Sequence, residues 1–384
     1  MAERVAPLQA SFTALREELE RQFAVSGNRK IFGAIRAVKA VDWHLRRPLR
    51  IAVMGEQSSG KSTLINMLLR ESVVPAGAFA GLKAHFMLRY GADTALYVIG
   101  PDGSRTRLTS KALARISTPG ARSAPGTNII YNAMDPALPR PREDLQSLSL
   151  LPGAMRPVTD GAAKLIEIVL PHPFLQRAEL METRAYPQNP AKSVLRRVYR
   201  PVDAAIWCTL STQAWKETER QTWRRLPASL RQNAILLVTY RDAIRTAQDE
   251  AKILTRLRRD AGSLFSEIMV VSLRHALEAM SVHGMIADHA KWDETGAPQF
   301  ESGLRARLDA LQWRRFQRSA AFLRRLSGLI SRSDPNSPLP ARSAEAIHEL
   351  FERSIGQIEA AGAVYFGPAK TGDRNPFFAV TSQR

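Results

Sequence analysis

The chain has 384 residues, of which 45% are hydrophobic and 24% charged, a globular composition that excludes wholesale disorder and allows one large domain plus an accessory one. Its single cysteine, Cys208, excludes a disulfide framework, and no apolar run approaches the ~20 residues of a membrane span. The net charge of +19 indicates attraction to anionic surfaces such as membranes, nucleic acid or a nucleotide, unless the arginines reflect genomic base composition alone. Because the first residues also lack the apolar core of a signal peptide, we expect a cytoplasmic protein.

Residues 1–48 are predicted to form an N-terminal helical hairpin. Apolar residues recur at helical spacing on both sides of a break at residues 26–28. The first set is Leu8, Phe12, Leu15, Leu19 and Phe23, and the second is Ile31, Ile35, Val38, Val41 and Leu45. The two apolar faces need a packing partner elsewhere in the chain.

The most informative motif is the phosphate-binding loop GxxxxGKS at residues 55–63. It follows an apolar run at residues 49–54 and opens a helical pattern at residues 62–69, which favours nucleotide binding over a coincidental turn. In such a loop the glycines let backbone N–H groups surround the phosphates, Lys61 reaches the outer phosphates and Ser62 ligates Mg²⁺. The predicted nucleotide-binding residues of the loop are Gly55, Ser59, Gly60, Lys61, Ser62 and Thr63.

Residues 49–295 are predicted to form one α/β domain. Strand patterns occur at residues 86–100, with a turn at 91–93, and at 165–170, 178–181, 204–209, 234–239 and 268–272. Helical stretches at residues 214–226 and 247–265 separate the later strands, and residues 117–160 form a Pro-rich surface excursion. This alternation predicts a mostly parallel P-loop NTPase-like sheet with helices on both faces and the phosphate loop at its carboxyl edge.

The C-terminal part, residues 296–362, is predicted to be helical, with a poorly ordered tail at residues 363–384. A predicted apolar stripe consists of Leu304, Leu308, Leu311, Phe322, Leu326 and Leu329, with Arg315 and Arg318 interrupting it. One interpretation packs this helix in a bundle with the N-terminal hairpin. The other lays its arginines on anionic lipid, with the leucines and phenylalanine inserted.

The segment GEQSSGKSTLIN at residues 55–66 resembles the first nucleotide motif of dynamin-like large GTPases, especially the bacterial ones. Further segments resemble later family motifs by order and spacing: residues 164–171, 180–185, 203–207, 237–242 and 271–279. The resemblance implies GTP or GDP and Mg²⁺ as bound cofactors. It also implies roles for Gln57 and Ser58 near the attacking water, for Glu182 near the metal, and for Thr239 and Asp242 at the guanine.

The chain departs from the family pattern at four positions. Leu82 stands where a switch threonine normally binds Mg²⁺, Glu182 replaces an aspartate, and Ala185 replaces a glycine that meets the γ-phosphate. Tyr240 replaces the lysine that normally lies along the base, and we infer that its ring can stack there. Because phosphoryl transfer depends on positioned charges, these losses predict slow hydrolysis or none.

The leading hypothesis is a dynamin-like GTP-binding protein that hydrolyses GTP slowly, with Gln57, Ser58 and Lys61 as candidate catalytic residues. A second reading is a catalytically inactive regulatory or scaffold protein, and a third is a structural protein on a membrane surface. Expected partners are a guanine nucleotide, a second copy through the GTPase domain, and anionic lipid at the inner membrane face. A nucleic-acid partner is not favoured, because no binding module is recognisable.

Overall fold

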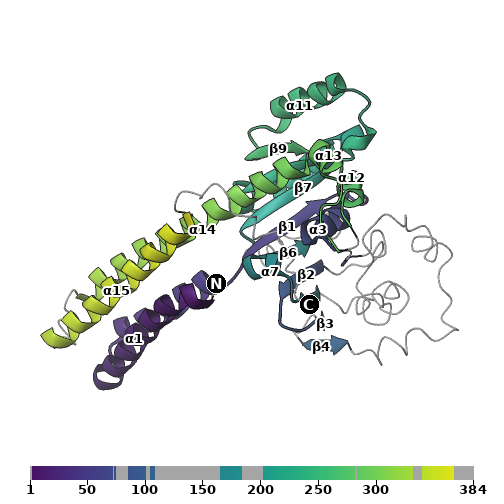
Figure 1. Cartoon of the computed structure of the whole chain (residues 1–384). Coiled ribbons are helices and arrows are strands. Elements are labelled where there is room, and N and C mark those ends of the chain that lie inside the picture. The colour runs from purple at the N-terminus through teal and green to yellow at the C-terminus, as the bar shows by residue number, and fades with distance from the viewer. Residues whose placement is uncertain are drawn as a thin grey trace. The chain divides into compact units, whose positions relative to one another are not determined.

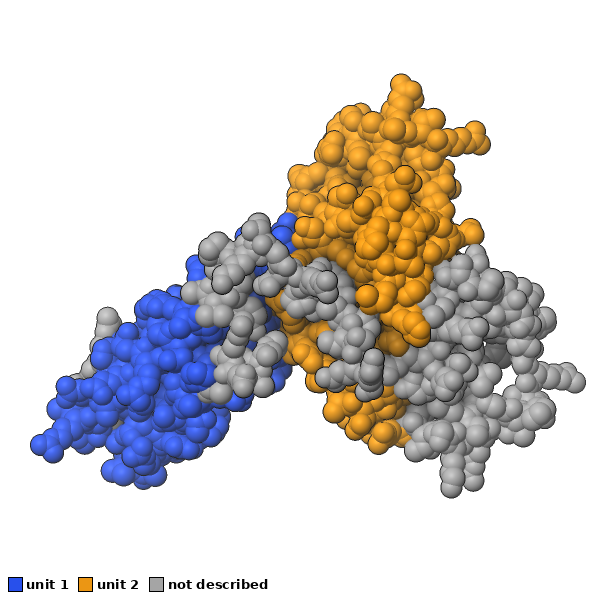
Figure 2. Space-filling model, in the orientation of Figure 1, with its two compact units in different colours: residues 1–47, 306–373 blue, residues 48–305, 374–384 orange. Residues whose placement is uncertain are grey.

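The computed structural model describes residues 2–71, 73–74, 85–100, 104–108, 165–183, 202–281, 283–331 and 340–366. The chain divides into two compact units, one of residues 1–47 and 306–373, the other of residues 48–305 and 374–384 (Figure 2). The predicted Pro-rich excursion at residues 117–160 lies outside the described residues, and so does the predicted tail from residue 367 onward. Residues 363–366 still belong to the last helix.

The larger unit is built on a sheet that has nine strands within the described residues, in the order β4-β3-β5-β2-β6-β1-β7-β8-β9 (Figure 1). The strands are β1 (Leu49–Gly55), β2 (His85–Tyr90), β3 (Ala95–Ile99), β4 (Arg105–Leu108), β5 (Leu165–Leu170), β6 (Ala178–Glu182), β7 (Ala204–Leu210), β8 (Ala234–Thr239) and β9 (Glu267–Val270). Strands β3 and β4, β3 and β5, and β2 and β6 pair antiparallel, whereas the other neighbours pair parallel. The prediction of a mostly parallel sheet is therefore confirmed.

Helices cover both faces of this sheet. Its helices are α3 (Lys61–Leu69), α7 (Pro173–Arg177), α9 (Glu217–Arg225), α10 (Ala228–Arg231), α11 (Ala247–Ala261), α12 (Leu273–Glu278) and α13 (His289–Glu294), with short 3₁₀ turns η2 (Ser211–Gln213) and η3 (Arg241–Ala243). Side chains of α9, α10 and α11 pack on the face that carries Met54 and Trp207. Helix α3 contacts β1 and β6 but contributes nothing to that cluster, so it covers the opposite face.

Three tryptophans fill the space between β7 and α9. Trp207, Trp215 and Trp223 are buried, and the rings of Trp207 and Trp223 meet edge to face with centroids 5.5 Å apart. The three side chains, which recur every eight residues, therefore pack in the core and do not form an exposed stacking platform.

Several predicted elements have different ends in the structure, and for two of them a hydrogen bond explains the difference. Strand β9 stops at Val270, two residues before the predicted end at 272, because Ser272 accepts a hydrogen bond from the backbone N–H of His275 as the N-cap of α12. Helix α9 starts only at Glu217, because residues 211–213 form η2 and the Glu219 side chain accepts from the backbone N–H of Lys216.

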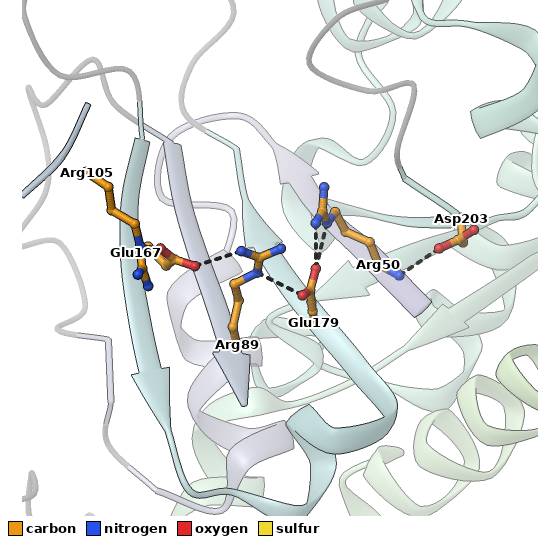
Figure 3. Close-up of polar contacts among 6 residues, drawn as sticks. All are labelled: Arg50, Arg89, Arg105, Glu167, Glu179 and Asp203. Atoms are coloured by element: carbon orange, nitrogen blue, oxygen red, sulfur yellow. Dashed lines mark hydrogen bonds and ion pairs between the residues drawn. The ribbon is translucent and has the colours of Figure 1, made fainter. Parts of the chain in front are cut away.

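A ladder of alternating arginines and carboxylates crosses one face of the sheet (Figure 3). The Glu167 carboxylate of β5 accepts from Arg105 of β4 and Arg89 of β2, both at 2.8 Å. Glu179 of β6 accepts from Arg89 at 2.8 Å and from Arg50 of β1 at 2.7 Å. These pairs cross-link β4, β5, β2, β6 and β1 near the end of the sheet opposite the phosphate loop, and thereby fix strands that no short connection joins.

The backbone of Arg50 extends the ladder toward β7. Its N–H donates to Asp203 Oδ2 at 2.9 Å, and the Asp203 N–H donates to the Arg50 carbonyl at 2.8 Å (Figure 3). At the other end, the Arg105 guanidinium lies 3.5 Å from the ring centre of Tyr97 on β3. Burial alone would raise the pKa of Glu167, but its hydrogen bonds from Arg89 and Arg105 hold that pKa below the ordinary value.

The smaller unit is a helical bundle. It contains α1 (Ala2–Ser26), α2 (Arg29–Arg46), α15 (Ala341–Phe366) and the part of α14 (Ala297–Ser331) that follows residue 305. Its buried core combines residues of all four helices, among them Leu15, Ile31, Leu323 and Phe351. Among the described residues, no helix combines the length and the apolarity needed to cross a bilayer.

The predicted stripe of the C-terminal helix is wrong at Phe322 and Leu329, whereas Leu326 packs against the bundle core as predicted. Phe316, Ala320, Leu323 and Ile330 of α14 are buried in the bundle core, whereas Phe322 and Leu329 are exposed. Arg315, predicted to interrupt the apolar face, is itself buried and donates to the Arg47 carbonyl at 2.7 Å. The apolar residues of α14 occupy more than one face, and contacts with α1, α2 and α15 decide which face is buried.

Candidate functional site

The predicted phosphate loop joins β1 to α3 in a conformation that depends on its glycines. Gly55 has a φ of 134°, and a Cβ there would lie 2.2 Å from the Cys208 carbonyl oxygen. Gly60 has a φ of 86°, and a Cβ there would lie 3.1 Å from a methyl carbon of Leu273. Neither position accepts a side chain without displacing its neighbours, so the backbone between them forms a tight cradle at the N-terminus of α3.

Lys61 folds back over this cradle. Its Nζ donates to the carbonyl oxygens of Gly55 at 3.1 Å and Glu56 at 2.6 Å, and the side chain is buried. The ammonium group is thereby held against the inner surface of the loop, where it can reach a bound phosphate.

Ser62 and Glu182 meet across the site. The Ser62 hydroxyl lies 3.0 and 3.2 Å from the two carboxylate oxygens of Glu182, which ends β6. Thr183, the next residue, holds the end of β6 against β1, since its N–H and hydroxyl both donate to the Val53 carbonyl. Thr63 follows Ser62 in the first turn of α3 and is half-buried.

The end of β8 is tied directly to the loop. The Thr239 hydroxyl lies 3.0 Å from the Ser59 carbonyl oxygen and 3.1 Å from that of Thr209, so Thr239 links the loop to β7 and β8. Asp242 is exposed, and its carboxylate accepts from the Ser272 hydroxyl at 2.7 Å. The sequence prediction did not include Ser272 as a site residue, although it placed Ser272 in the last family-like segment.

Tyr240 reaches from the end of β8 to the loop. Its hydroxyl donates to the Ser58 carbonyl at 3.2 Å, and its own carbonyl accepts from the Ser211 hydroxyl at 2.8 Å. The side chain remains 43% exposed.

The outer turn of the loop carries Gln57 and Ser58, both exposed. Beside them, the Glu56 carboxylate accepts from Lys216 at 3.1 Å and from Thr218 at 2.7 Å, contacts that the sequence analysis missed. Burial alone would raise the pKa of Glu56, but these two hydrogen bonds hold it below the ordinary value. Glu56 therefore anchors the outer turn to the start of α9 as a carboxylate.

The residues present fit a phosphate group and a magnesium ion. Ser59 Oγ is buried and has no hydrogen-bond partner in the described part of the chain, a polar atom that a phosphate oxygen would satisfy. The oxygens of Ser62 and Glu182 are of the type that Mg²⁺ prefers. Two of the predicted departures, Leu82 and Ala185, lie outside the described residues.

Comparison with known proteins gives one family match and two curated relatives. The model of the dynamin family matches residues 51–111. Dynamin-like protein 2 of Campylobacter jejuni subsp. jejuni serotype O:23/36 (strain 81-176) is 23% identical over 246 residues, covering 64% of this chain and 34% of that protein. GTPase Der of Mesorhizobium japonicum (strain LMG 29417 / CECT 9101 / MAFF 303099) is 28% identical over 144 residues, covering 35% of this chain and 29% of that protein. The chain thus spans about a third of the length of these relatives.

Among solved structures, one of an oligomerised bacterial dynamin pair, described as providing a mechanism for the long-range sensing and tethering of membranes, matches with a TM-score of 0.44. It is 16% identical and covers 78% of this chain and 42% of that one. A point variant of Aquifex aeolicus Era bound to GDP-AlF₄⁻ matches with a TM-score of 0.29, at 13% identity over 59% of this chain and 52% of that one.

Proposed function

Because the chain belongs to the bacterial dynamin-like GTPases, we propose that it binds GTP and GDP together with Mg²⁺ at the loop between β1 and α3. The carrying observation is that Thr239, from the base-recognition segment, is hydrogen-bonded to Ser59 of the phosphate loop. This contact supports the proposal, because it joins the segment proposed to bind the base to the loop proposed to bind the phosphates.

Each described residue then has a distinct task. Lys61 and the backbone N–H groups at the start of α3 bind the phosphates, and Ser62 and Glu182 would hold the metal, which neutralises phosphate charge when bound. Asp242, oriented by Ser272, accepts from the ring N–H and amino group of guanine. Adenine presents no matching pair of donors, so this carboxylate favours guanine.

Hydrolysis is proposed to be slow. Glu182 stands where the family has an aspartate, and its longer side chain already engages the Ser62 hydroxyl. Gln57 and Ser58, the proposed water-positioning residues, are exposed on the outer turn of the loop. A chain without turnover would instead act as a nucleotide-dependent regulatory or scaffold protein, and self-association through the larger unit remains a prediction for either form.

Isothermal calorimetry with GTP, GDP and ATP, each with and without Mg²⁺, tests this proposal. GTP and GDP are expected to bind at least about tenfold more tightly than ATP, because ATP leaves the Asp242 carboxylate without its donors. Mg²⁺ is expected to increase the affinity for GTP. Equal or tighter binding of ATP would overturn the role given to Asp242, and no binding of any nucleotide would overturn the function.

A second candidate function, contact with anionic membrane, is supported by the turn between α1 and α2. Val25 and Phe32 are 86% and 48% exposed there, beside exposed Arg29 and Lys30. Apolar side chains flanked by basic ones suit a surface of anionic headgroups.

Sedimentation with phosphatidylserine-containing vesicles, against pure phosphatidylcholine, tests this second function. The protein is expected to bind only the anionic vesicles, and Val25→Asp is expected to weaken binding by about tenfold because it places a charge at the inserted position. Trp43→Asp, an exposed apolar residue near the other end of α2, is the matched control and should bind normally. Equal binding of the Val25 variant and the wild type would exclude this turn as the contact.

A further inference from the structure

Tyr240 lies between the two halves of the proposed nucleotide site. It follows Thr239, which bonds to Ser59, and precedes by two residues Asp242, which is held by Ser272. Its hydroxyl spans the gap to the outer turn of the loop and donates to the Ser58 carbonyl at 3.2 Å. One side chain thus connects the segment assigned to the base with the loop assigned to the phosphates.

Both ends of this hydrogen bond lie on strained backbone. Ser58 has a φ of 61° and Tyr240 a φ of 57°, values in the left-handed region that non-glycine residues adopt only at a cost in free energy. Such conformations persist where the surroundings hold them. The Ser211 hydroxyl holds the Tyr240 carbonyl, and the Tyr240 hydroxyl in turn holds the Ser58 peptide.

The ring of Tyr240 remains available to a ligand. Although its hydroxyl is engaged, the side chain is 43% exposed, and Asp242, which is also exposed, follows it by two residues. A planar aromatic group next to a carboxylate that binds the edge of a base is suited to stack on that base.

We propose that Tyr240 has two separable roles: its hydroxyl positions the outer turn of the phosphate loop, and its ring forms the stacking surface for the purine. The inference rests on the proposed nucleotide site and assigns within it the group that replaces the missing lysine. Tyr240 is thus a positioning residue toward the phosphates and a specificity residue toward the base.

Two ligands separate the roles: GTP, which has a base, and inorganic tripolyphosphate, which has none. Tyr240→Phe is expected to lower the affinity for both ligands by the same factor, about threefold to tenfold, because it removes one hydrogen bond from the loop. Tyr240→Leu is expected to lower the affinity for tripolyphosphate by the same factor as Tyr240→Phe does. It is expected to lower the affinity for GTP by about a further fivefold to a hundredfold, because the stacking surface is also lost. Calorimetry measures both affinities, and thermal unfolding without ligand checks that each variant is folded.

Tyr90→Leu is the matched control. Tyr90 is 45% exposed, close to the value for Tyr240. It is the last residue of β2, at the end of the sheet that lies opposite the loop. This variant should bind both ligands as the wild type does.

Four outcomes would overturn the inference in whole or in part. Wild-type affinities in Tyr240→Phe for both ligands would remove the positioning role, and equal losses of GTP and tripolyphosphate in Tyr240→Leu would remove the stacking role. If the wild type binds GTP and both variants match it, only this inference fails. If the wild type binds no nucleotide, the proposed function fails and the inference fails with it.

Discussion

Replacing Lys61 by alanine is expected to weaken GTP binding by about 100-fold or more. The Nζ atom makes two hydrogen bonds to loop carbonyls and would exchange them for charge-assisted bonds to phosphate oxygens, each worth about 1.5–3 kcal/mol. Calorimetry with GTP measures the loss directly.

Lys252→Ala serves as the matched control for this experiment. Lys252 lies on α11 with its side chain 68% exposed, and its surface pair with Asp249 contributes little. Its loss should leave GTP binding unchanged. Phosphate release should be measured on the same samples: slow release by the wild type that vanishes in Lys61→Ala supports a GTPase, whereas tight GTP binding without release supports the regulatory reading. Unchanged GTP affinity in Lys61→Ala would contradict the assignment of the loop.

Replacing Arg70 by methionine is expected to destabilise the larger unit by about 3–5 kcal/mol. Arg70 follows α3, and its guanidinium contacts both carboxylate oxygens of Glu301 of α14, at 2.7 and 2.8 Å, with both side chains buried. It also lies 4.4 Å from the ring centre of Trp292. The single substitution leaves the Glu301 carboxyl buried without its cation, whereas the double variant Arg70→Met, Glu301→Leu removes both charges and should recover most of the loss.

This loss should depend on pH. Burial raises the pKa of Glu301 to about 7 from its ordinary 4.5, although Arg70 opposes the rise. A carboxyl that binds its proton more tightly when folded contributes stability that is fully present below about pH 4.5 and declines as the pH rises through 7. Without Arg70 the pKa rises further, so the destabilisation of Arg70→Met relative to the wild type should be larger at pH 8 than at pH 5.

Urea denaturation at both pH values measures these differences. Arg274→Met is the control, since Arg274 pairs with Glu278 on the surface and its side chain is 69% exposed. It should change the free energy of unfolding by less than about 1 kcal/mol. Equal losses in the single and double variants would contradict the account, because the damage would then come from packing around Arg70 and not from the buried carboxyl.

Contiguous segments were predicted well from the sequence. The strands at residues 165–170 and 234–239 begin and end where predicted, because each consists mostly of apolar residues that the sheet buries. The phosphate loop was identified for the same reason: its glycines, lysine and serine are consecutive, so strand, loop and helix follow from local conformation. The roles of all the predicted site residues in binding or catalysis, from Gly55 to Asp242, remain predictions.

Contacts between distant segments were not predicted. Strand β2 lies between β5 and β6, although neither precedes or follows it directly within the described residues, and the arginine–carboxylate ladder depends on that order. Glu301 is 231 residues from Arg70, and helical spacing alone could not show which face of α14 would be buried. The strand order and the buried face of α14 depend on contacts with helices and strands that are distant in the sequence.

The sequence by itself determined that this chain has a glycine-bounded loop between a strand and a helix of an α/β sheet, and helices in its N- and C-terminal segments, because short-range backbone conformation and apolar periodicity are encoded locally. Only the tertiary structure decided what surrounds that loop. Three residues reach it because parallel strands end at one edge of the sheet: Thr239, Tyr240 and Glu182. Hydrogen bonds between residues 120 to 182 positions apart in the sequence hold them there. The physical reason is that strand order and register, which bring these groups together, depend on packing across the whole sheet.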